Sequence, residues 1–321
     1  MASTHRNPAA RVFTPEAGAV PFPGYQLVRL RGRGGFATVW ESTSPSGELI
    51  ALKFMSTQSA NVAAKEIRSL QSIQALDHPN LTRIIQVWSM PGQIVIGMEL
   101  GDASMFDLML LYHHDLGQHI DTVKLFGFMC QVAQALDFLN ARQHTAEGRL
   151  VGYQHADVKP NNLLLFGDVV KLADYGLSAT TSGGNTPCPR QGTAEYAAPE
   201  VFQGYLAESS DQFSLGVTYY LLRTGAFPYP PPPAPGAPKK SYVRPPPDLT
   251  LLPEPERPVV GRALAAIPIN RFPTCGDFVA GLMAANGLAV PDGLATLRRK
   301  GSSGIVQVAD AAAHEATVTV R

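Results

Sequence analysis

Residues 152–165 of this chain read GYQHADVKPNNLLL, and residues 174–176, which begin nine positions further on, read DYG. These two stretches bring together the carboxylates of Asp157 and Asp174, the ammonium group of Lys159 and the amide of Asn162. Phosphoryl transfer requires such a set: a carboxylate for the attacking hydroxyl, oxygen ligands for Mg²⁺ and a positive charge near the moving phosphate. We therefore take this region as the candidate catalytic centre.

The residues between the two carboxylates predict a β-hairpin. Residues 163–165 are an apolar run, residues 166–168 read FGD, and residues 169–172 read VVKL, which is the pattern of strand, tight turn and strand. Such a hairpin would hold Asp157 and Asp174 close together, at the end opposite its turn.

This arrangement resembles the protein kinase family, whose pattern is H-R-D-x-K-P-x-N followed by D-F-G. Two positions depart from it: Ala156 stands where the family usually has Arg, and Tyr175 where it usually has Phe. The resemblance implies an α+β, two-lobed protein-kinase-like fold. It has a small β-rich N-lobe, a larger helical C-lobe and a nucleotide between them.

Composition is compatible with a large globular domain. The chain has 321 residues, of which 45% are hydrophobic and 16% are charged, so a substantial core is expected. Lys plus Arg equals Asp plus Glu at 26 each, so nothing indicates a nucleic-acid or anionic-membrane partner.

The cysteines and the apolar runs indicate a cytoplasmic setting. Cys130, Cys188 and Cys275 are too few and too scattered for a disulfide framework or a zinc site. No apolar run approaches the roughly 18 residues of a membrane helix, and no signal peptide is recognised at the start. We therefore expect a cytoplasmic protein without a membrane segment.

The first hundred residues have mainly strand patterns. After a flexible, proline-containing leader over 1–24, strand-like runs cover 25–31, 37–44 and 49–55. A glycine-rich loop joins the first two runs and could admit a phosphate to its backbone N–H groups, although a tight hairpin would use the same residues. With Lys53 on the next strand, it resembles the glycine-rich loop and strand-three lysine of kinases.

By this resemblance the nucleotide site draws on the glycine-rich loop, two strands, the hinge and the catalytic segment. Its residues are Arg31, Gly32, Arg33, Gly34, Gly35, Phe36, Ala37, Thr38, Val39, Ala51, Lys53, Met98, Glu99, Leu100 and Leu164. Met98 would be the gatekeeper beside the adenine, and Glu99 and Leu100 would form the hinge. The family usually has Leu, Ile or Val in place of Arg31, whose methylene stem would then have to cover the ring.

Residues 60–75 predict a helix, because apolar residues recur every three positions on one face. Glu66 lies on this helix. Without context it reads as a solvated glutamate, whereas the resemblance makes it the partner of Lys53.

Helical patterns dominate after residue 101. Residues 121–142 give the strongest helix, with Cys130 on its apolar face as core packing rather than a reactive thiol. Another buried helix begins near 210, where Asp211 is either a simple N-cap or, by resemblance, the anchor of the catalytic-loop backbone.

Residues 177–191 are polar, and residues 192–200, which read GTAEYAAPE, resemble the end of a kinase activation segment. By resemblance the Thr193 hydroxyl bonds Asp157 and Lys159, and Arg271 pairs with Glu200. Ala156 carries no guanidinium, so it cannot clamp a phosphate added to this segment, and we expect such phosphorylation not to be the main switch.

Residues 228–258 hold 13 of the 27 prolines. We interpret them as a stiff surface loop, or alternatively as a docking motif for a partner with an aromatic-lined domain. The predicted kinase domain covers 25–288, with its N-lobe over 25–100 and its C-lobe over 101–288. A flexible tail over 289–321 follows.

The resemblance also assigns roles. Asp157 would accept or orient the proton of the attacking hydroxyl, and Lys159 would neutralise the γ-phosphate. Asn162 and Asp174 would hold Mg²⁺ or Mn²⁺. The Lys-Pro context of Lys159 looks like the serine/threonine branch, so protein Ser and Thr side chains are the expected substrates.

Lys53, positioned by Glu66, would grip the α- and β-phosphates of ATP. Thr193 completes the set of expected catalytic residues.

Two alternatives remain. The departures from the family pattern are compatible with a pseudokinase, a module that binds nucleotide or partners without turnover; these departures are Arg31, Ala37, Ala156 and Tyr175. A small-molecule phosphotransferase of the antibiotic-kinase kind also uses a His-x-Asp and a downstream Asp, but the segment 192–200 is not expected in that class.

Overall fold

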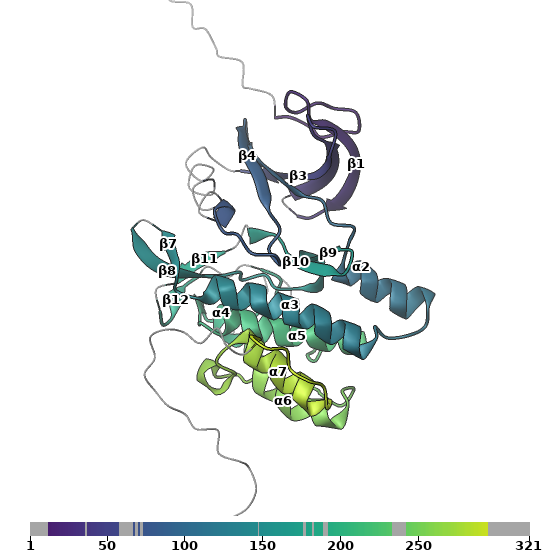
Figure 1. The fold of residues 1–321 in the computed structure, drawn as a ribbon. Helices are drawn as coiled ribbons and strands as arrows, with labels where there is room; N and C mark the ends of the chain where they lie inside the picture. The colour runs from purple at the N-terminus through teal and green to yellow at the C-terminus, as the bar shows by residue number, and fades with distance from the viewer. Residues whose placement is uncertain are drawn as a thin grey trace, which may run out of the picture.

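The computed structural model describes residues 12–35, 37–57, 67, 70, 73–146, 148–175, 178–181, 183–188, 192–232 and 242–294. A small β-rich lobe is stacked on a larger, mainly helical lobe (Figure 1). The predicted two-lobed α+β fold is confirmed.

The small lobe is built on one antiparallel sheet in the order β1-β2-β3-β5-β4. Its strands are β1 (Gln26–Arg33), β2 (Ala37–Thr43), β3 (Leu49–Ser56), β4 (Ile84–Met90) and β5 (Gln93–Glu99). The first three confirm the predicted strands. β3 lies between β2 and β5, and residues 50–54 of it are all buried because side chains cover both faces there.

The described part of the expected leader packs on this sheet. The ring of Phe13 stacks on Phe54 at 5.8 Å between centroids, and Phe22 stacks on Trp88 at 4.4 Å. The Leu27 N–H donates to the Ala19 carbonyl at 2.9 Å. Apolar burial and backbone hydrogen bonds therefore fix residues 12–24, which the sequence reading expected to be loose.

Most of the helix predicted over 60–75 lies outside the described residues. Within it, Ile67, Leu70, Ile73 and Gln74 are helical, and Leu70 and Ile73 are buried in the core. Glu66 and Phe36 also lie outside the described residues.

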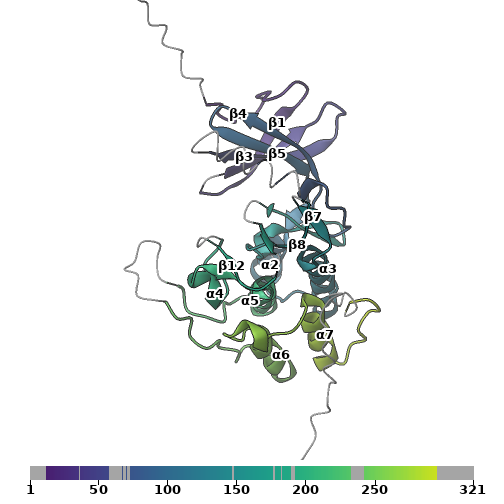
Figure 2. The same ribbon diagram turned by 90° about the vertical axis from the view of Figure 1, so that its left-hand side faces the viewer.

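The large lobe is mainly helical, and Figure 2 shows α3, α5, α6 and α7 below the sheet of the small lobe. Its helices are α2 (Met105–Leu110), the π-helical turn 111–115, α3 (Thr122–Asn140), α4 (Pro199–Phe202), α5 (Ser210–Thr224), α6 (Arg257–Ala263) and α7 (Cys275–Ala285). Short 3-10 turns cover 160–162, 254–256 and 268–270.

The strongest predicted helix is confirmed as α3, which Asp121 caps by accepting the Lys124 N–H at 2.9 Å. Cys130 is buried on it against Met283, and this burial raises the pKa of the thiol to about 11. The thiol is therefore protonated and packed in the core, as expected. Among the described residues, no helix combines the length and apolarity that a bilayer crossing requires.

Short strands connect the lobes. The predicted hairpin is confirmed as β9 (Leu163–Phe166) and β10 (Val169–Leu172), with β6 (Ala103–Ser104) beside β9. Gly167 in its turn has φ of 61°. Two smaller sheets were not predicted: β7 (His144–Ala146), β8 (Arg149–Gln154) and β11 (Ala179–Thr181), and the pair β12 (Thr186–Pro187) and β13 (Tyr205–Leu206).

A buried ion pair joins α4 to the segment before α7. Arg271 Nη1 and Nη2 donate to Glu200 Oε1 and Oε2, each at 2.7 Å, and both residues are buried. The pair expected by resemblance is thus present, in the bidentate geometry that favours arginine.

Candidate active site

Three predicted site residues surround the carboxylate of a fourth, Asp157. Lys159 Nζ lies 2.7 Å from Asp157 Oδ2 and 2.6 Å from Thr193 Oγ1. Thr193 donates to Asp157 Oδ1 through its hydroxyl at 2.9 Å and its backbone N–H at 3.0 Å. Asn162 Nδ2 donates to the Asp157 backbone carbonyl at 2.8 Å and to Oδ2 at 3.0 Å. These bonds fix the orientation of the Asp157 carboxylate, which is 8% exposed.

The loop that carries Asp157 is anchored from below by α5. Asp211 accepts the backbone N–H groups of His155 at 2.7 Å and Ala156 at 2.9 Å. The N-cap of α5 is Ser209, so the simple N-cap interpretation of Asp211 is wrong and the anchor expected by resemblance is present. Asp211 is fully buried, and this burial raises the pKa of its carboxyl.

Two residues at the site have left-handed backbone. Ala156 has φ of 65° and Asp174 has φ of 69°, and they are the only non-glycine residues with positive φ in the described part of the chain. Such conformations cost about 1–2 kcal/mol each and are concentrated at functional sites. Opposite Ala156, Gly192 has φ of 83°, and a Cβ there would lie 2.6 Å from the Ala156 carbonyl oxygen. Gly192 therefore lets the activation segment approach the catalytic loop.

An ionic contact also joins the small lobe to the large lobe at the site. Lys53 Nζ on β3 donates to Asp174 Oδ1, just after β10, at 2.5 Å. Both side chains line a small cavity of about 10 Å³ together with Ile96, Met98 and Tyr175. Lys53 and Asp174 are thus brought together, while the expected partner Glu66 is not described.

Tyr175, which follows Asp174, is accommodated by a hydrogen bond from its hydroxyl. Tyr175 is buried, and its hydroxyl donates to the Leu172 carbonyl at 2.6 Å. Burial raises the pKa of the phenol far above its ordinary value, so the hydroxyl stays a donor. The bond satisfies the one polar atom that Tyr adds to the Phe of the family pattern.

The glycine-rich stretch forms the predicted hairpin between β1 and β2. Gly32 pairs with Val39 and Arg33 with Thr38. The Gly34 N–H donates to the Ala37 carbonyl at 2.8 Å. Of the expected phosphate loop, Gly35 is described at the tip and Phe36 is not.

The hinge residues are held by side chains of both lobes. Ala51 on β3 pairs with Met98 on β5, and Glu99 accepts Lys171 Nζ at 2.5 Å. A Cβ on Gly101 would lie 3.0 Å from the Leu164 Cβ, so Leu164 packs directly against the chain leaving the hinge. Leu100 is partly buried against the core.

Arg31 has its guanidinium turned toward the hinge. Nη2 donates to the Asp102 carbonyl at 2.8 Å, and Nη1 donates to Glu41 Oε2 at 3.1 Å. Arg29 also binds Glu41, and the two arginines lower the pKa of this buried carboxyl. That the Arg31 stem covers an adenine stays a prediction.

The sequence reading missed Glu41 as the counter-ion of Arg31. The sequence contained a signal for this contact, because side chains alternate between the two faces of a strand and place Arg29 and Arg31 of β1 on one face. Arg29 is in register with Glu41 on the neighbouring strand β2.

The oxygen atoms of Asn162 and Asp174 are suitable ligands for a hard cation such as Mg²⁺. Asn162 donates through its amide nitrogen, which leaves its carbonyl oxygen as a ligand atom, and Asp174 offers a carboxylate whose side chain is 35% exposed. No cluster of three or more His, Cys, Asp or Glu forms a metal cage within the described residues. Two protein oxygens completed by substrate phosphates and water are a common way to bind Mg²⁺.

Comparison with known proteins shows that the chain is similar to protein kinases. A model of the protein kinase domain matches residues 25–237. The chain is 30% identical to the SNF1-like protein kinase ssp2 of Schizosaccharomyces pombe over 238 residues, which are 71% of this chain and 38% of that protein. It is 29% identical to the serine/threonine-protein kinase PknJ of Mycobacterium tuberculosis over 293 residues, 84% of this chain and 46% of PknJ. The chain therefore spans less than half of the length of either relative.

Proposed function

Because this chain belongs to the protein kinase domain family, we propose that it transfers the γ-phosphoryl group of ATP to Ser and Thr hydroxyls of protein substrates. The observation that carries the proposal is the intact network of Lys159, Thr193 and Asn162 around Asp157. None of the residues to which the resemblance assigns chemistry is replaced.

In this proposal Asp157 orients the substrate hydroxyl and takes up its proton as the bond to phosphorus forms. The Thr193 and Asn162 donors hold the carboxylate in place, so it needs no reorientation during the reaction. Lys159 lies 2.7 Å from the same carboxylate and supplies positive charge to the transferred group.

Asp174 and Asn162 would hold Mg²⁺ or Mn²⁺, which neutralises charge on the nucleotide phosphates. Lys53 would contact the α- and β-phosphates, and its 2.5 Å bond to Asp174 keeps it at the cleft without a nucleotide. The roles of Glu66 and of the glycine-rich loop are carried over from the resemblance.

We also propose a cytoplasmic location and a docking partner for the proline-rich segment. The cysteines form no disulfide in the described part of the chain, which supports a reducing compartment. The segment 228–232 and 242–258 carries exposed Val243 and Leu251, which support a docking surface.

A nucleotide- or partner-binding module without turnover is the second candidate. It is favoured by Arg31, whose guanidinium bonds the Asp102 carbonyl at the edge of the hinge. This hydrogen bond between Arg31 and Asp102 would restrict the entry of nucleotide into the cleft and its release.

The deciding experiment incubates the purified chain with γ-labelled ATP, Mg²⁺ and a generic acceptor protein. The wild-type chain should produce phosphoserine or phosphothreonine. Asp157→Asn and Asp174→Asn should each reduce the rate by roughly 100-fold or more. Asp168→Asn, in the exposed turn between β9 and β10, is the matched control and should retain the rate.

Equal transfer by Asp174→Asn and the wild type would contradict the proposal. Mg·ATP that raises the melting temperature without any transfer would instead support the binding-module alternative.

A further inference from the structure

The proline-rich segment delivers one arginine into the interior of the large lobe. Arg244 is only 7% exposed although it precedes three prolines and follows Val243, which is 81% exposed. The expectation of a surface loop is therefore wrong at this residue. Its burial needs an explanation because a guanidinium is strongly hydrated in water and charged at every physiological pH.

The Arg244 side chain ends at the backbone of the activation segment. Nη2 donates to the Ala194 carbonyl at 2.6 Å and the Ala197 carbonyl at 2.9 Å, with the Glu195 carbonyl at 3.3 Å. These three carbonyls belong to one tight turn, in which the Tyr196 N–H donates to the Thr193 carbonyl at 3.0 Å. All three bonds come from one nitrogen, Nη2, and the Ala194 carbonyl also accepts the Ala197 N–H at 3.3 Å. The guanidinium therefore adds a charged donor to the carbonyls of this turn through one end of its fork.

Aromatic rings enclose the same guanidinium. Its central carbon lies 4.4 Å from the ring centroid of Tyr229, 5.4 Å from that of Phe202 and 5.8 Å from that of Phe213. Carbonyl dipoles and ring faces thus stabilise the charge, and no carboxylate pairs with Arg244 among the described residues. Burial lowers the pKa of Arg244, and the nearby Tyr229 and Tyr242 oppose that shift.

Two of its donors remain unused. Nε and Nη1 are buried and have no hydrogen-bond partner among the residues that the structure describes. An arginine buried without a carboxylate and with incomplete hydrogen bonds lowers stability relative to an apolar residue. Such a group is consistent with a positional role, because packing alone would be better served by Met or Leu.

The turn that Arg244 holds is adjacent to the catalytic carboxylate. Thr193 bonds Asp157, and residues 194–197 follow directly. On the opposite side Ser214 of α5 donates its hydroxyl to the Tyr196 carbonyl at 3.0 Å. The turn is therefore fixed at three points, by Asp157, by α5 and by Arg244. A polypeptide that places a hydroxyl at Asp157 must run beside it.

We propose that Arg244 is a positioning residue for protein substrates, through which the proline-rich segment shapes the substrate-binding turn 193–197. The inference rests on the proposed function and deepens it, since the substrate class is a polypeptide that packs on this turn. Arg244 touches neither the nucleotide site nor Asp157, so its effect should be confined to the acceptor.

The test compares Arg244→Ala and Arg244→Lys with Arg257→Ala. Arg257 is the matched control because it is exposed and donates to the carbonyls of Leu252 and Thr250, within the same segment but away from the turn. For Arg244→Ala, the KM for the acceptor protein should rise about tenfold, equivalent to about 1.4 kcal/mol, while the KM for ATP stays within about twofold. Arg244→Lys should recover part of the loss, and Arg257→Ala should match the wild type.

Amide hydrogen exchange without nucleotide gives a readout that does not require activity. Exchange over 194–197 should be faster in both Arg244 variants than in the wild type and in Arg257→Ala, with unchanged exchange in α3 as evidence of folding. Unchanged exchange in a folded Arg244 variant, or an equal rise in the two KM values, would overturn the proposal. A wild-type chain without transfer would contradict only the proposed function, because the exchange measurement would still decide the role of Arg244.

Discussion

At the scale of single residues, Ala156 departs from the family pattern, which usually has Arg at this position. Its methyl group occupies a left-handed position beside Gly192, where the resemblance would place a charged arginine side chain. The methyl group of Ala156 therefore cannot hold a phosphate on the activation segment. The segment offers Thr180, Thr181, Ser182 and Thr186 as hydroxyls that could accept a phosphate, and of these Thr181 is buried and paired with Gly152 between β11 and β8. The described part of the segment is ordered by strand pairing and by Thr193.

We expect removal of phosphates from the activation segment to leave activity within tenfold, about 1.4 kcal/mol in the barrier. The measurement compares phosphatase-treated and autophosphorylated enzyme, with the modified residues mapped. A variant with Ala at Thr180, Thr181, Ser182 and Thr186 should behave like the treated enzyme; Ser182 lies outside the described residues.

Ala156→Arg is the matched control, because it restores the missing donor and should make activity depend on the phosphates. A loss beyond tenfold in the wild type on dephosphorylation would show that another cation replaces the arginine.

Residues whose surroundings are local, or fixed by the family pattern, could be predicted from the sequence. The strands of the small lobe, α3, the β9–β10 hairpin and the bonds of Thr193 follow from periodicity or from motif spacing. The bonds from Arg31 to the Asp102 carbonyl and from Arg244 to the Ala194 carbonyl could not be predicted. Their partners lie 71 and 50 positions away, and no residue type identifies a backbone carbonyl as an acceptor. Arg271 and Glu200 are equally distant, but the family pattern identifies both.

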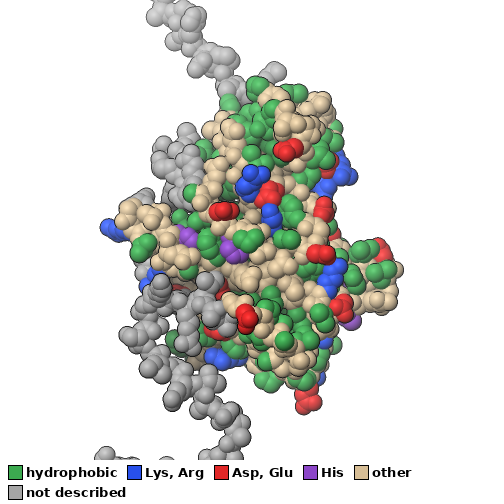
Figure 3. Space-filling view, in the orientation of Figure 1, with side chains coloured by type: hydrophobic (Ala, Val, Ile, Leu, Met, Phe, Trp, Pro, Cys, Tyr) green, Lys and Arg blue, Asp and Glu red, His purple; other side chains and the backbone are tan. Residues whose placement is uncertain are grey.

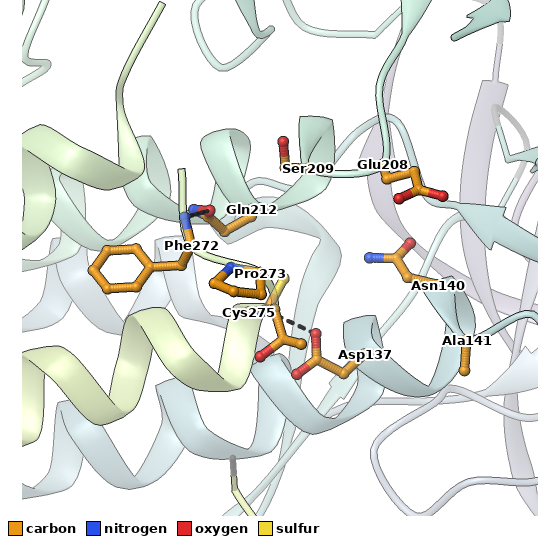
Figure 4. A pocket seen from close by; sticks show the side chains of 10 residues that line it. Asp137, Asn140, Ala141, Glu208, Ser209, Gln212, Phe272, Pro273 and Cys275 are labelled. Atoms are coloured by element: carbon orange, nitrogen blue, oxygen red, sulfur yellow. Dashed lines mark hydrogen bonds between the residues drawn. The ribbon is translucent and has the colours of Figure 1, made fainter. Parts of the chain in front are cut away.

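At the scale of elements, α3 holds the start of α7 through one carboxylate. Asp137 Oδ1 and Oδ2 accept the N–H groups of Cys275 and Gly276, each at 2.8 Å. Figure 4 shows the bond to Cys275. Thr274 caps the same helix by accepting the Asp277 N–H at 2.9 Å. A small cavity of about 20 Å³ beside Asp137 has room for one or two water molecules and not for a ligand.

Burial raises the pKa of Asp137 to about 6, against the opposing effect of its two backbone hydrogen bonds. In the unfolded chain this carboxyl titrates near 4, so between the two values the folded protein binds more protons. The contribution of Asp137 to the free energy of unfolding is therefore greatest at low pH and falls as the pH rises through about 6. Relative to Asp137→Asn, the wild type should lose on the order of 2 kcal/mol between pH 4 and pH 7.

Urea unfolding at several pH values measures this difference, and the exposed Asp292→Asn serves as the control. Parallel pH curves for the wild type and Asp137→Asn would mean that the backbone donors outweigh the desolvation of the carboxylate.

At the scale of the whole molecule, acidic and basic residues are equal in number, at 26 each. Basic and acidic side chains are interspersed on the face in Figure 3, in line with a net charge of zero. Both side chains of the Glu200–Arg271 pair are buried, and Arg271 also donates to the Ser209 and Ala265 carbonyls. This pair joins the end of the activation segment to the base of the large lobe.

Glu200→Gln should reduce the free energy of unfolding by roughly 3–5 kcal/mol, because it leaves Arg271 buried without a counter-ion. The double variant Glu200→Gln with Arg271→Met should lose less than the sum of the single losses, since no uncompensated charge remains. Urea unfolding provides the values. Glu208→Gln, which breaks the exposed pair with Arg142, is the control and should cost less than about 1 kcal/mol. Strict additivity would mean that the two charges act independently.

The strand order β1-β2-β3-β5-β4 matters for the way the chain is made on the ribosome. All five strands lie between residues 26 and 99, so the first lobe has its whole sheet before the synthesis of Asp174, the partner of Lys53. Chains grow at about 5–20 residues per second, and β-hairpins form in about 1–10 μs. The small lobe should therefore become resistant to protease on nascent chains stalled after β5 has emerged. Complete digestion of such chains would show that the sheet waits for the helices beneath it.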